Sequence, residues 1–138
     1  MKKEKSCGAI IINDKKEILL VKQTKGHYSF PKGHVESGET EIETAIRETK
    51  EETNIDILVD DTKKYKITYQ VGENVIKDVV YFLAHPISYK LIPQKSEVIE
   101  LLWVPITDVN KYLGFENIIK VWNEEIINDI KKKEGSIW

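Results

Sequence analysis

The sequence predicts an α/β or α+β domain in which a mixed β-sheet carries one helix on each face. The prediction depends on two helical patterns, over residues 41–53 and 115–132, and on the Ile- and Val-rich stretches that lie before and between them. The chain has 138 residues, of which 41% are hydrophobic, and this is enough for one hydrophobic core. We therefore expect a single domain over residues 1–138.

The first helix has a sequence signal at each end. Thr40 and Glu43 form a capping box, in which each side chain accepts a hydrogen bond from a backbone N–H group at the helix N-terminus. Asn54 readily adopts the left-handed conformation that ends a helix. These signals predict a helix over residues 41–53, followed by an extended segment that starts at Ile55.

Five stretches have the composition of β-strands. Residues 6–12 and 18–21 are predicted to form a hairpin around a polar turn, and residues 64–71 and 75–84 form a second hairpin around a Gly-Glu-Asn turn. A fifth strand is expected over residues 98–104, where a proline follows it.

The last third of the chain ends in predicted helices. A short helix is expected over residues 106–113, directly after the fifth strand. Beyond it, apolar residues recur at helical spacing, as in an amphipathic helix that packs on a sheet, and this pattern predicts the helix over residues 115–132. The apolar residues are Phe115, Ile118, Ile119, Trp122, Ile126 and Ile130.

The composition excludes several classes of protein. The formal net charge of −2 lacks the positive excess of a protein that binds extended nucleic acid, although a local pocket can still be basic. Cys7 is the single cysteine, so no intrachain disulfide can form, and we expect it to be a small buried strand residue. Neither a signal peptide nor a long apolar span is evident, and we expect a cytoplasmic protein that does not bind a membrane.

Three glutamates, Glu48, Glu51 and Glu52, stand at positions i, i+3 and i+4 of the first helix and therefore share one face. Their repulsion, at the negative end of the helix dipole, is explained if a cation binds there. Oxygen ligands favour Mg²⁺, with Mn²⁺ as an alternative, and Mg²⁺ is often shared with the phosphates of a substrate. Another face of the helix is apolar and is expected to pack on the core, so that the carboxylates project away from it; this face contains Ile42, Ala45 and Ile46.

The residues in and before this helix resemble a known motif, the Nudix box of the Nudix hydrolases. The matching residues are Gly33, Glu39, Arg47-Glu48 and Glu51-Glu52. Two positions depart from the family pattern, because Thr49 replaces an aliphatic residue and Asn54 replaces a glycine. The resemblance implies the Nudix fold, an α/β/α sandwich with a mixed β-sheet, and Mg²⁺-dependent hydrolysis of a phosphoanhydride bond.

The resemblance also implies roles for single residues of the motif. Glu51 and Glu52 would be the main metal ligands, and Glu48 would be a further ligand or the base that acts on water. Arg47 would pair with Glu39 or hold Glu48 in place, close to the chemistry.

Two further metal ligands are implied outside the helix. They are the backbone carbonyl of Lys32 and the carboxylate of Glu97, which would approach the metal from another part of the chain. From the residues alone, Glu97 is a charged residue before a strand.

The likeness extends beyond the motif to the asymmetrical dinucleoside tetraphosphate hydrolases, which cut diadenosine tetraphosphate into ATP and AMP. The segments that carry this likeness are residues 30–36, 43–49, 79–84 and 96–103. It implies that Lys32, His34 and Lys77 supply positive charge to the phosphate chain. Tyr81 and Phe115 would contact phosphate or stack on adenine, and a place in the core is the alternative for each.

Other interpretations stay open. Other Nudix activities share the metal site and act on oxidised nucleoside triphosphates, ADP-ribose or RNA 5′ ends. A non-catalytic nucleotide-binding module would not need the full acidic set, which this chain retains. His27 and His85 are expected at the surface. A small nucleotide is the expected partner, and both a monomer and a homodimer are compatible with the sequence.

Overall fold

The structure, a computed structural model, describes residues 1–133. Its strands are β1 (Lys2–Ile11), β2 (Glu17–Gln23), β3 (Tyr28–Ser29), β4 (Lys32–His34), β5 (Ile57–Val71), β6 (Val75–Pro86) and β7 (Val98–Pro105). Its α-helices are α1 (Glu41–Thr53), α2 (Val109–Tyr112), α3 (Glu116–Val121) and α4 (Ile127–Lys133). A 3₁₀ turn (Ile106–Asp108) precedes α2, and a π-helical turn (Trp122–Ile126) joins α3 to α4.

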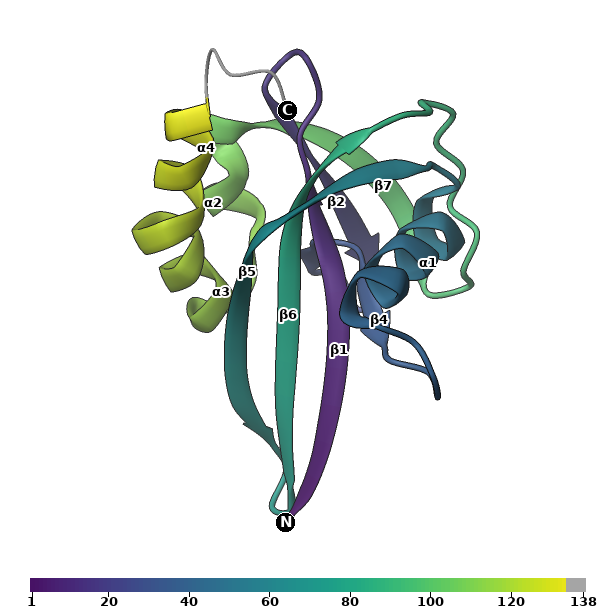
Figure 1. The fold of residues 1–138 in the computed structure, drawn as a ribbon, viewed down its shortest axis with the longest axis vertical. Coiled ribbons are helices and arrows are strands. Elements are labelled where there is room, and N and C mark those ends of the chain that lie inside the picture. Colours follow the sequence, from purple (N-terminus) through teal and green to yellow (C-terminus); the bar gives the residue numbers. More distant parts are fainter. Residues whose placement is uncertain (134–138) are drawn as a thin grey trace.

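The strands form two sheets. The larger sheet is mixed, with the order β4-β1-β6-β5 and a parallel β1–β6 pair, and the smaller sheet is antiparallel, with the order β3-β2-β7. The helices form two outer layers, with α1 on one side of the strands and α2, α3 and α4 on the other (Figure 1). This arrangement confirms the predicted α/β class with a mixed sheet.

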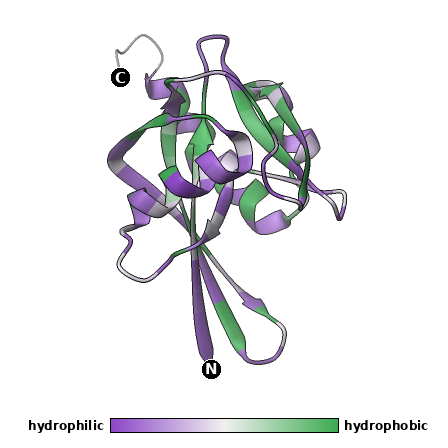
Figure 2. Cartoon of the chain, turned by 90° about the vertical axis from the view of Figure 1, so that its right-hand side faces the viewer, coloured by the Kyte–Doolittle hydropathy of each residue, from purple (hydrophilic) through white to green (hydrophobic). Residues whose placement is uncertain are grey.

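The predicted hairpin of residues 6–12 and 18–21 is wrong. The two strands belong to different sheets and meet in one isolated bridge, between Ile12 and Ile18. Both strands are buried on both faces, so each needs a covering layer, and β2 takes β7 as its long partner instead. Figure 2 shows apolar strands inside the molecule and polar residues on its outer segments.

The other predicted elements are confirmed. The β5–β6 pair is the second hairpin, and β7 covers the fifth predicted strand. The helix over residues 115–132 exists as α3, the π-helical turn and α4, and its Trp122 is fully buried against Phe30, with ring centroids 6.0 Å apart. Cys7 is fully buried in β1, and this burial raises the pKa of its thiol to about 11.

The boundaries of α1 agree with its sequence signals. Thr40 and Glu43 make both hydrogen bonds of the capping box, and Asn54 ends the helix with a φ of 75°. The predicted packing of the apolar face is confirmed for Ala45, which is fully buried, and for Ile42, which packs against the core. The predicted orientation is wrong for Ile46, which is 38% exposed, and for Glu48 and Glu52, which are 4% and 5% exposed. The acidic face of α1 is therefore turned inward, toward β4 and the loop before β7, rather than toward solvent.

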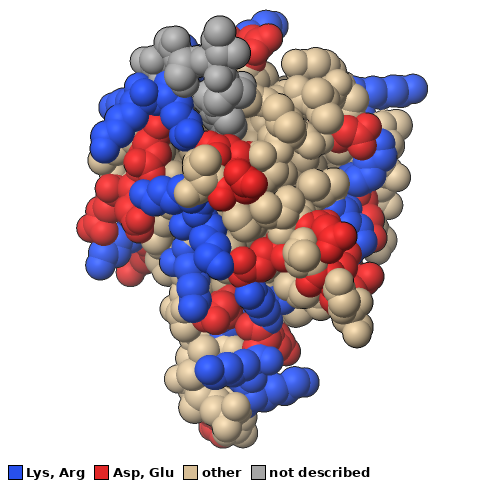
Figure 3. Space-filling model, in the orientation of Figure 1, with Lys and Arg blue, Asp and Glu red and all other residues tan. Residues whose placement is uncertain are grey.

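Charged side chains of both signs are mixed over the face of the molecule drawn in Figure 3. This mixture agrees with a net charge near zero. No helix within residues 1–133 is long and apolar enough to cross a membrane.

Candidate active site

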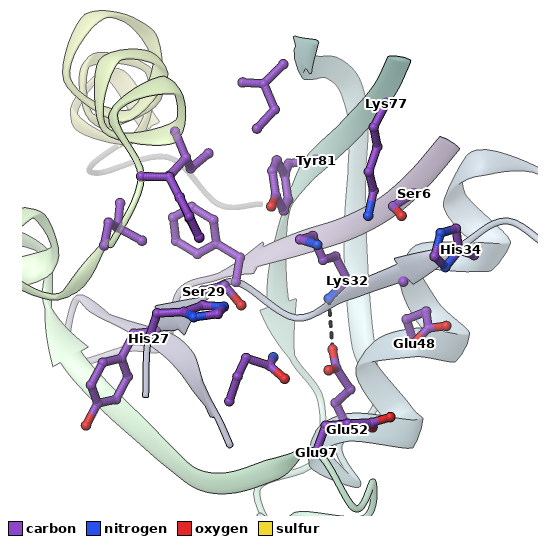
Figure 4. A pocket seen from close by; sticks show the side chains of 18 of the residues that line it. Ser6, His27, Ser29, Lys32, His34, Glu48, Glu52, Lys77, Tyr81 and Glu97 are labelled. Carbon is purple, nitrogen blue, oxygen red and sulfur yellow. Dashed lines mark hydrogen bonds between the residues drawn. The ribbon is translucent and has the colours of Figure 1, made fainter. Parts of the chain in front are cut away.

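A pocket of about 670 Å³ lies between the two sheets, α1 and the start of α3. It brings together eight of the residues that the sequence singles out, from distant parts of the chain (Figure 4). They are Lys32, His34, Glu48, Glu52, Lys77, Tyr81, Glu97 and Phe115. Arg47 and Glu51 are not among the lining residues: Arg47 hydrogen-bonds to Glu48, and Glu51 pairs with Arg47.

Glu48 reaches the pocket because Gly33 has no side chain. A Cβ atom at position 33 would lie 2.0 Å from Cδ of Glu48, far below any real contact. The glycine of the motif therefore lets β4 and α1 approach until the carboxylate enters the space beside the strand.

Glu52 is fixed by the backbone of β4. The N–H group of Lys32 donates a 2.9 Å hydrogen bond to Oε1 of Glu52. Burial raises the pKa of the Glu52 carboxyl to about 7, and this hydrogen bond opposes the shift only in part. Glu52 thus has one carboxylate oxygen oriented by the backbone of β4.

Arg47 connects the acidic residues with one another. Its guanidinium binds Glu39 through two hydrogen bonds of 2.6 and 3.0 Å, and it donates a 3.0 Å hydrogen bond to Oε2 of Glu48. It also contacts Glu51 at 3.1 Å and the carbonyl of His34 at 2.9 Å. Both contacts that the sequence offered as alternatives for Arg47, with Glu39 and with Glu48, are therefore present together.

Lys95, which the sequence analysis does not single out, lies within the acidic cluster. Its ammonium group is paired with Oε1 of Glu48 and lies 3.3 Å from Oε2 of Glu51. Its loop is docked on the end of α1, because Gln94 donates hydrogen bonds to the carbonyl of Lys50 and to the side chain of Asn54. Lys95 and Glu48 are 47 positions apart in the chain, so no local sequence pattern could predict their contact.

The carboxylates offer the oxygen atoms that Mg²⁺ prefers. Within the part of the chain that the structure describes, no group of three Asp, Glu, His or Cys side chains converges closely enough to hold a metal ion. Instead, the ammonium of Lys95 bridges Glu48 and Glu51. The acidic face therefore accommodates a cation, which in this structure is the ammonium group of Lys95.

Lys32 and Lys77 form a basic wall of the same pocket, beside the acidic wall that Glu48 and Glu52 form on α1. Lys32 and Lys77 make no ion pair with a carboxylate among the described residues. Burial, followed by repulsion from Lys77, lowers the pKa of the Lys32 ammonium to about 8. Lys77 thus makes the charged form of Lys32 less stable, and an anion bound beside the two side chains would offset this repulsion.

His34, predicted to bind substrate, and Glu97, predicted to bind the metal, lie at the edge of the pocket's charged cluster. His34 is exposed, with its Nε2 3.5 Å from a carboxylate oxygen of Glu4. Glu97 is exposed as well, and its backbone carbonyl accepts a 2.8 Å hydrogen bond from the N–H group of Thr24. The structure brings both residues to the pocket without a contact to Glu48 or Glu52.

The two aromatic candidates occupy different environments. Tyr81 is 2% exposed and packs edge-on against Phe30 in the core, with ring centroids 5.4 Å apart, so its hydroxyl end is what can face the pocket. Phe115 is 54% exposed and lies edge-on to His27 at 5.2 Å. His27, expected at the surface, is half-buried and lines the pocket, which makes it a second residue that the sequence analysis missed.

Comparison with known proteins identifies the family of this chain. A family model described as the NUDIX domain matches residues 2–125, and the chain belongs to the Nudix hydrolase family. It is 32% identical to the asymmetrical bis(5′-nucleosyl)-tetraphosphatase of Rattus norvegicus, over 83% of this chain and 87% of the rat protein. It is 35% identical to the enzyme of the same name from Sus scrofa, over 87% and 91% of the two chains.

A solved structure is similar over nearly the whole chain. The C. elegans Ap4A hydrolase, in a binary complex, superposes with a TM-score of 0.80 at 26% identity, and the match covers 93% of this chain and 98% of that chain. The motif, the fold and these relatives identify the protein as a Nudix hydrolase with similarity to the tetraphosphatases of this family.

Proposed function

We propose that this protein hydrolyses a phosphoanhydride bond of a dinucleoside polyphosphate and cuts diadenosine tetraphosphate into ATP and AMP. The observation that supports this most is that one pocket has both an acidic wall, on α1, and a basic wall, on β4 and β6. A long polyphosphate is an anion that can touch both walls, through a divalent cation at the first and directly at the second.

Mg²⁺ is the cofactor that suits the acidic wall, and Mn²⁺ can replace it. Glu48, Glu51 and Glu52 would hold it, with Glu97 and the carbonyl of Lys32 completing the ligands. When bound, such an ion lowers the pKa of a water molecule and neutralises charge that builds up on the phosphate oxygens.

The chain's own residues would prepare this chemistry. Arg47 keeps the carboxylate of Glu48 oriented, because it holds one oxygen of Glu48 and is itself fixed by Glu39. Glu48 and Glu52 are the candidates to accept a proton from the attacking water, since both are buried and line the pocket.

The far end of the pocket is suited to a nucleoside. Phe115 offers an exposed ring beside His27, and Leu113 and Ile118 add apolar surface to the same end. Aromatic rings bind a base through its flat face with little dependence on its identity. Tyr81 is too buried to stack on a base, and its hydroxyl is the group that would reach a phosphate.

Product analysis tests the proposal directly. Purified protein is incubated with Mg²⁺ and diadenosine tetraphosphate, and the nucleotides are separated by ion exchange. Equal amounts of ATP and AMP are expected, whereas two molecules of ADP or no cleavage would contradict the proposed reaction.

Three other substrates are tested in parallel, because other Nudix hydrolases share the acidic wall. They are ADP-ribose, an oxidised dGTP and an RNA with a 5′ triphosphate. Faster cleavage of one of these would be consistent with the proposed metal site but would contradict diadenosine tetraphosphate as the preferred substrate.

A further inference from the structure

The larger sheet presents one face to the pocket, and strand register shows which side chains share it. Residues that pair across neighbouring strands lie on the same face. Ser6 pairs with His34 on β4 and with Val79 on β6. Gly8 and Glu4 stand two residues from Ser6 on either side and therefore share its face. Gly8 pairs with Lys32 on β4, and Glu4 pairs with Lys77 on β6. Ser6 on β1 therefore lies between the two lysines of the basic wall.

The side chain of Ser6 has no partner of its own. The residue is 0% exposed, and its Oγ atom makes no hydrogen bond within residues 1–133. It nevertheless lines the pocket, and Figure 4 shows it on the same wall as Lys77 and Lys32. A buried hydroxyl without a partner destabilises the folded chain, and alanine would avoid this cost.

The groups around Ser6 favour an anion as the hydrogen-bond acceptor for its hydroxyl. The hydroxyl can donate one hydrogen bond, and the two neighbouring ammonium groups can donate several more. Lys77, like Lys32, has no carboxylate partner in the described part of the chain, and its flexible side chain can move when a ligand arrives. A phosphate group offers several charged oxygens and can accept from all three residues at once.

We propose that the Ser6 hydroxyl, together with Lys32 and Lys77, binds a phosphate group of the substrate that is not attacked. The inference rests on the proposed function, because it places the part of a polyphosphate chain that extends beyond the acidic wall. Ser6 is then a specificity residue: it strengthens the binding of long phosphate chains and does not touch the reacting phosphorus.

The test separates this role from a purely structural one. Wild type, Ser6→Ala and Thr49→Val are titrated in Mg²⁺ buffer with the imido analogue of tripolyphosphate, whose bridges resist hydrolysis. Thr49 is the matched control, because its hydroxyl is also buried and unpartnered but does not line the pocket. Calorimetry gives the affinity, and thermal unfolding of the free proteins gives the Tm.

Ser6→Ala is expected to weaken binding of the analogue about tenfold or more, since a hydrogen bond to a charged group is lost. Its Tm should equal or exceed that of wild type, because an unpartnered buried hydroxyl has been removed. Thr49→Val should bind like wild type. An affinity of Ser6→Ala within twofold of wild type, an equal loss in Thr49→Val, or a lower Tm of Ser6→Ala would overturn the proposal.

These outcomes are independent of the substrate. Loss of binding in Ser6→Ala from a protein that does not cut diadenosine tetraphosphate would keep the phosphate site and reject the proposed reaction. Cleavage of that substrate, with normal binding by Ser6→Ala, would reject the role of Ser6 alone.

Discussion

The ammonium group of Lys95 is paired with the carboxylate of Glu48, in the middle of the acidic face of α1. Glu51 is its second partner, at 3.3 Å. Lys95 therefore pairs with the carboxylate oxygens that a divalent cation would need. Its side chain is 31% exposed, so solvent partly screens this ion pair. A lysine in this position would compete with the proposed metal ion for these carboxylates.

Removing Lys95 should strengthen metal binding. We expect Lys95→Ala to bind Mn²⁺ about three- to tenfold more tightly than wild type, because an ion pair in a partly exposed site contributes about 1 kcal/mol. Electron paramagnetic resonance of free Mn²⁺ measures the affinity without turnover. Lys25→Ala is the control, since Lys25 lines the same pocket and its loss changes the net charge equally. Unchanged or weaker binding by Lys95→Ala would show that the lysine does not compete.

Glu52→Gln should lower kcat at least about a hundredfold, because a charged ligand of the proposed metal ion would be replaced by a neutral one. The fold should survive, since the amide oxygen can still accept the hydrogen bond from the N–H group of Lys32. Activity at saturating Mg²⁺ and the Tm are measured on the same preparation. A Tm near that of wild type with full activity would remove Glu52 from the metal ligands.

The pairing of Glu39 with Arg47 predicts a specific dependence of stability on pH. The hydrogen bonds from Arg47 hold the pKa of Glu39 at about 2, below its ordinary value. A carboxyl with a lowered pKa stabilises the fold above its unfolded pKa and loses that contribution as the pH falls toward its folded pKa. Glu39→Gln should therefore be less stable than wild type at pH 7, and the difference should shrink between about pH 4.5 and pH 2.

Urea unfolding at several pH values measures this difference. Glu73→Gln is a suitable control, because Glu73 lies in the β5–β6 turn and has no ion pair among the described residues. A difference for Glu39→Gln that stays constant down to pH 2 would mean that the Arg47 pair does not stabilise the fold.

The parts of the site that the sequence predicts are those set by local spacing. The capping box of Thr40 and Glu43, the stop at Asn54 and the shared face of the glutamates all depend on residues three to five positions apart. The burial of Glu48 is different, because it depends on the approach of β4 at Gly33. It therefore could not be derived from the helix alone, and the apolar residues on another face suggested the opposite.

Long-range arrangement accounts for the remaining differences. Lys95 reaches Glu48 because its loop docks on the end of α1, and His27 enters the pocket because it packs on Phe115. The strands around Asn13 look like a hairpin because a polar turn separates two apolar runs, but that pattern does not say whether the strands stay paired. Tertiary packing decides this, and it separates them into two sheets.

Tyr81 needs a milder substitution than alanine. Its ring is 2% exposed in the core, so Tyr81→Ala would cost about 3–5 kcal/mol of stability and would not report on binding. Tyr81→Phe keeps the ring and removes the hydroxyl, and we expect a several-fold higher KM with a similar Tm if the hydroxyl reaches a phosphate. Steady-state kinetics with diadenosine tetraphosphate checks this, and unchanged kinetics would assign Tyr81 to the core alone.

Phe115→Ala should raise KM about tenfold and leave stability nearly unchanged. The ring is 54% exposed at the proposed nucleoside end of the pocket, so its removal costs the core little but would take away a stacking surface. Stacking of a base on an aromatic ring contributes about 1–3 kcal/mol. Tyr89→Ala is the matched control, because Tyr89 is 62% exposed and does not line the pocket. If both variants have the KM of wild type, the base binds elsewhere; if both have a raised KM, the effect does not come from stacking on Phe115.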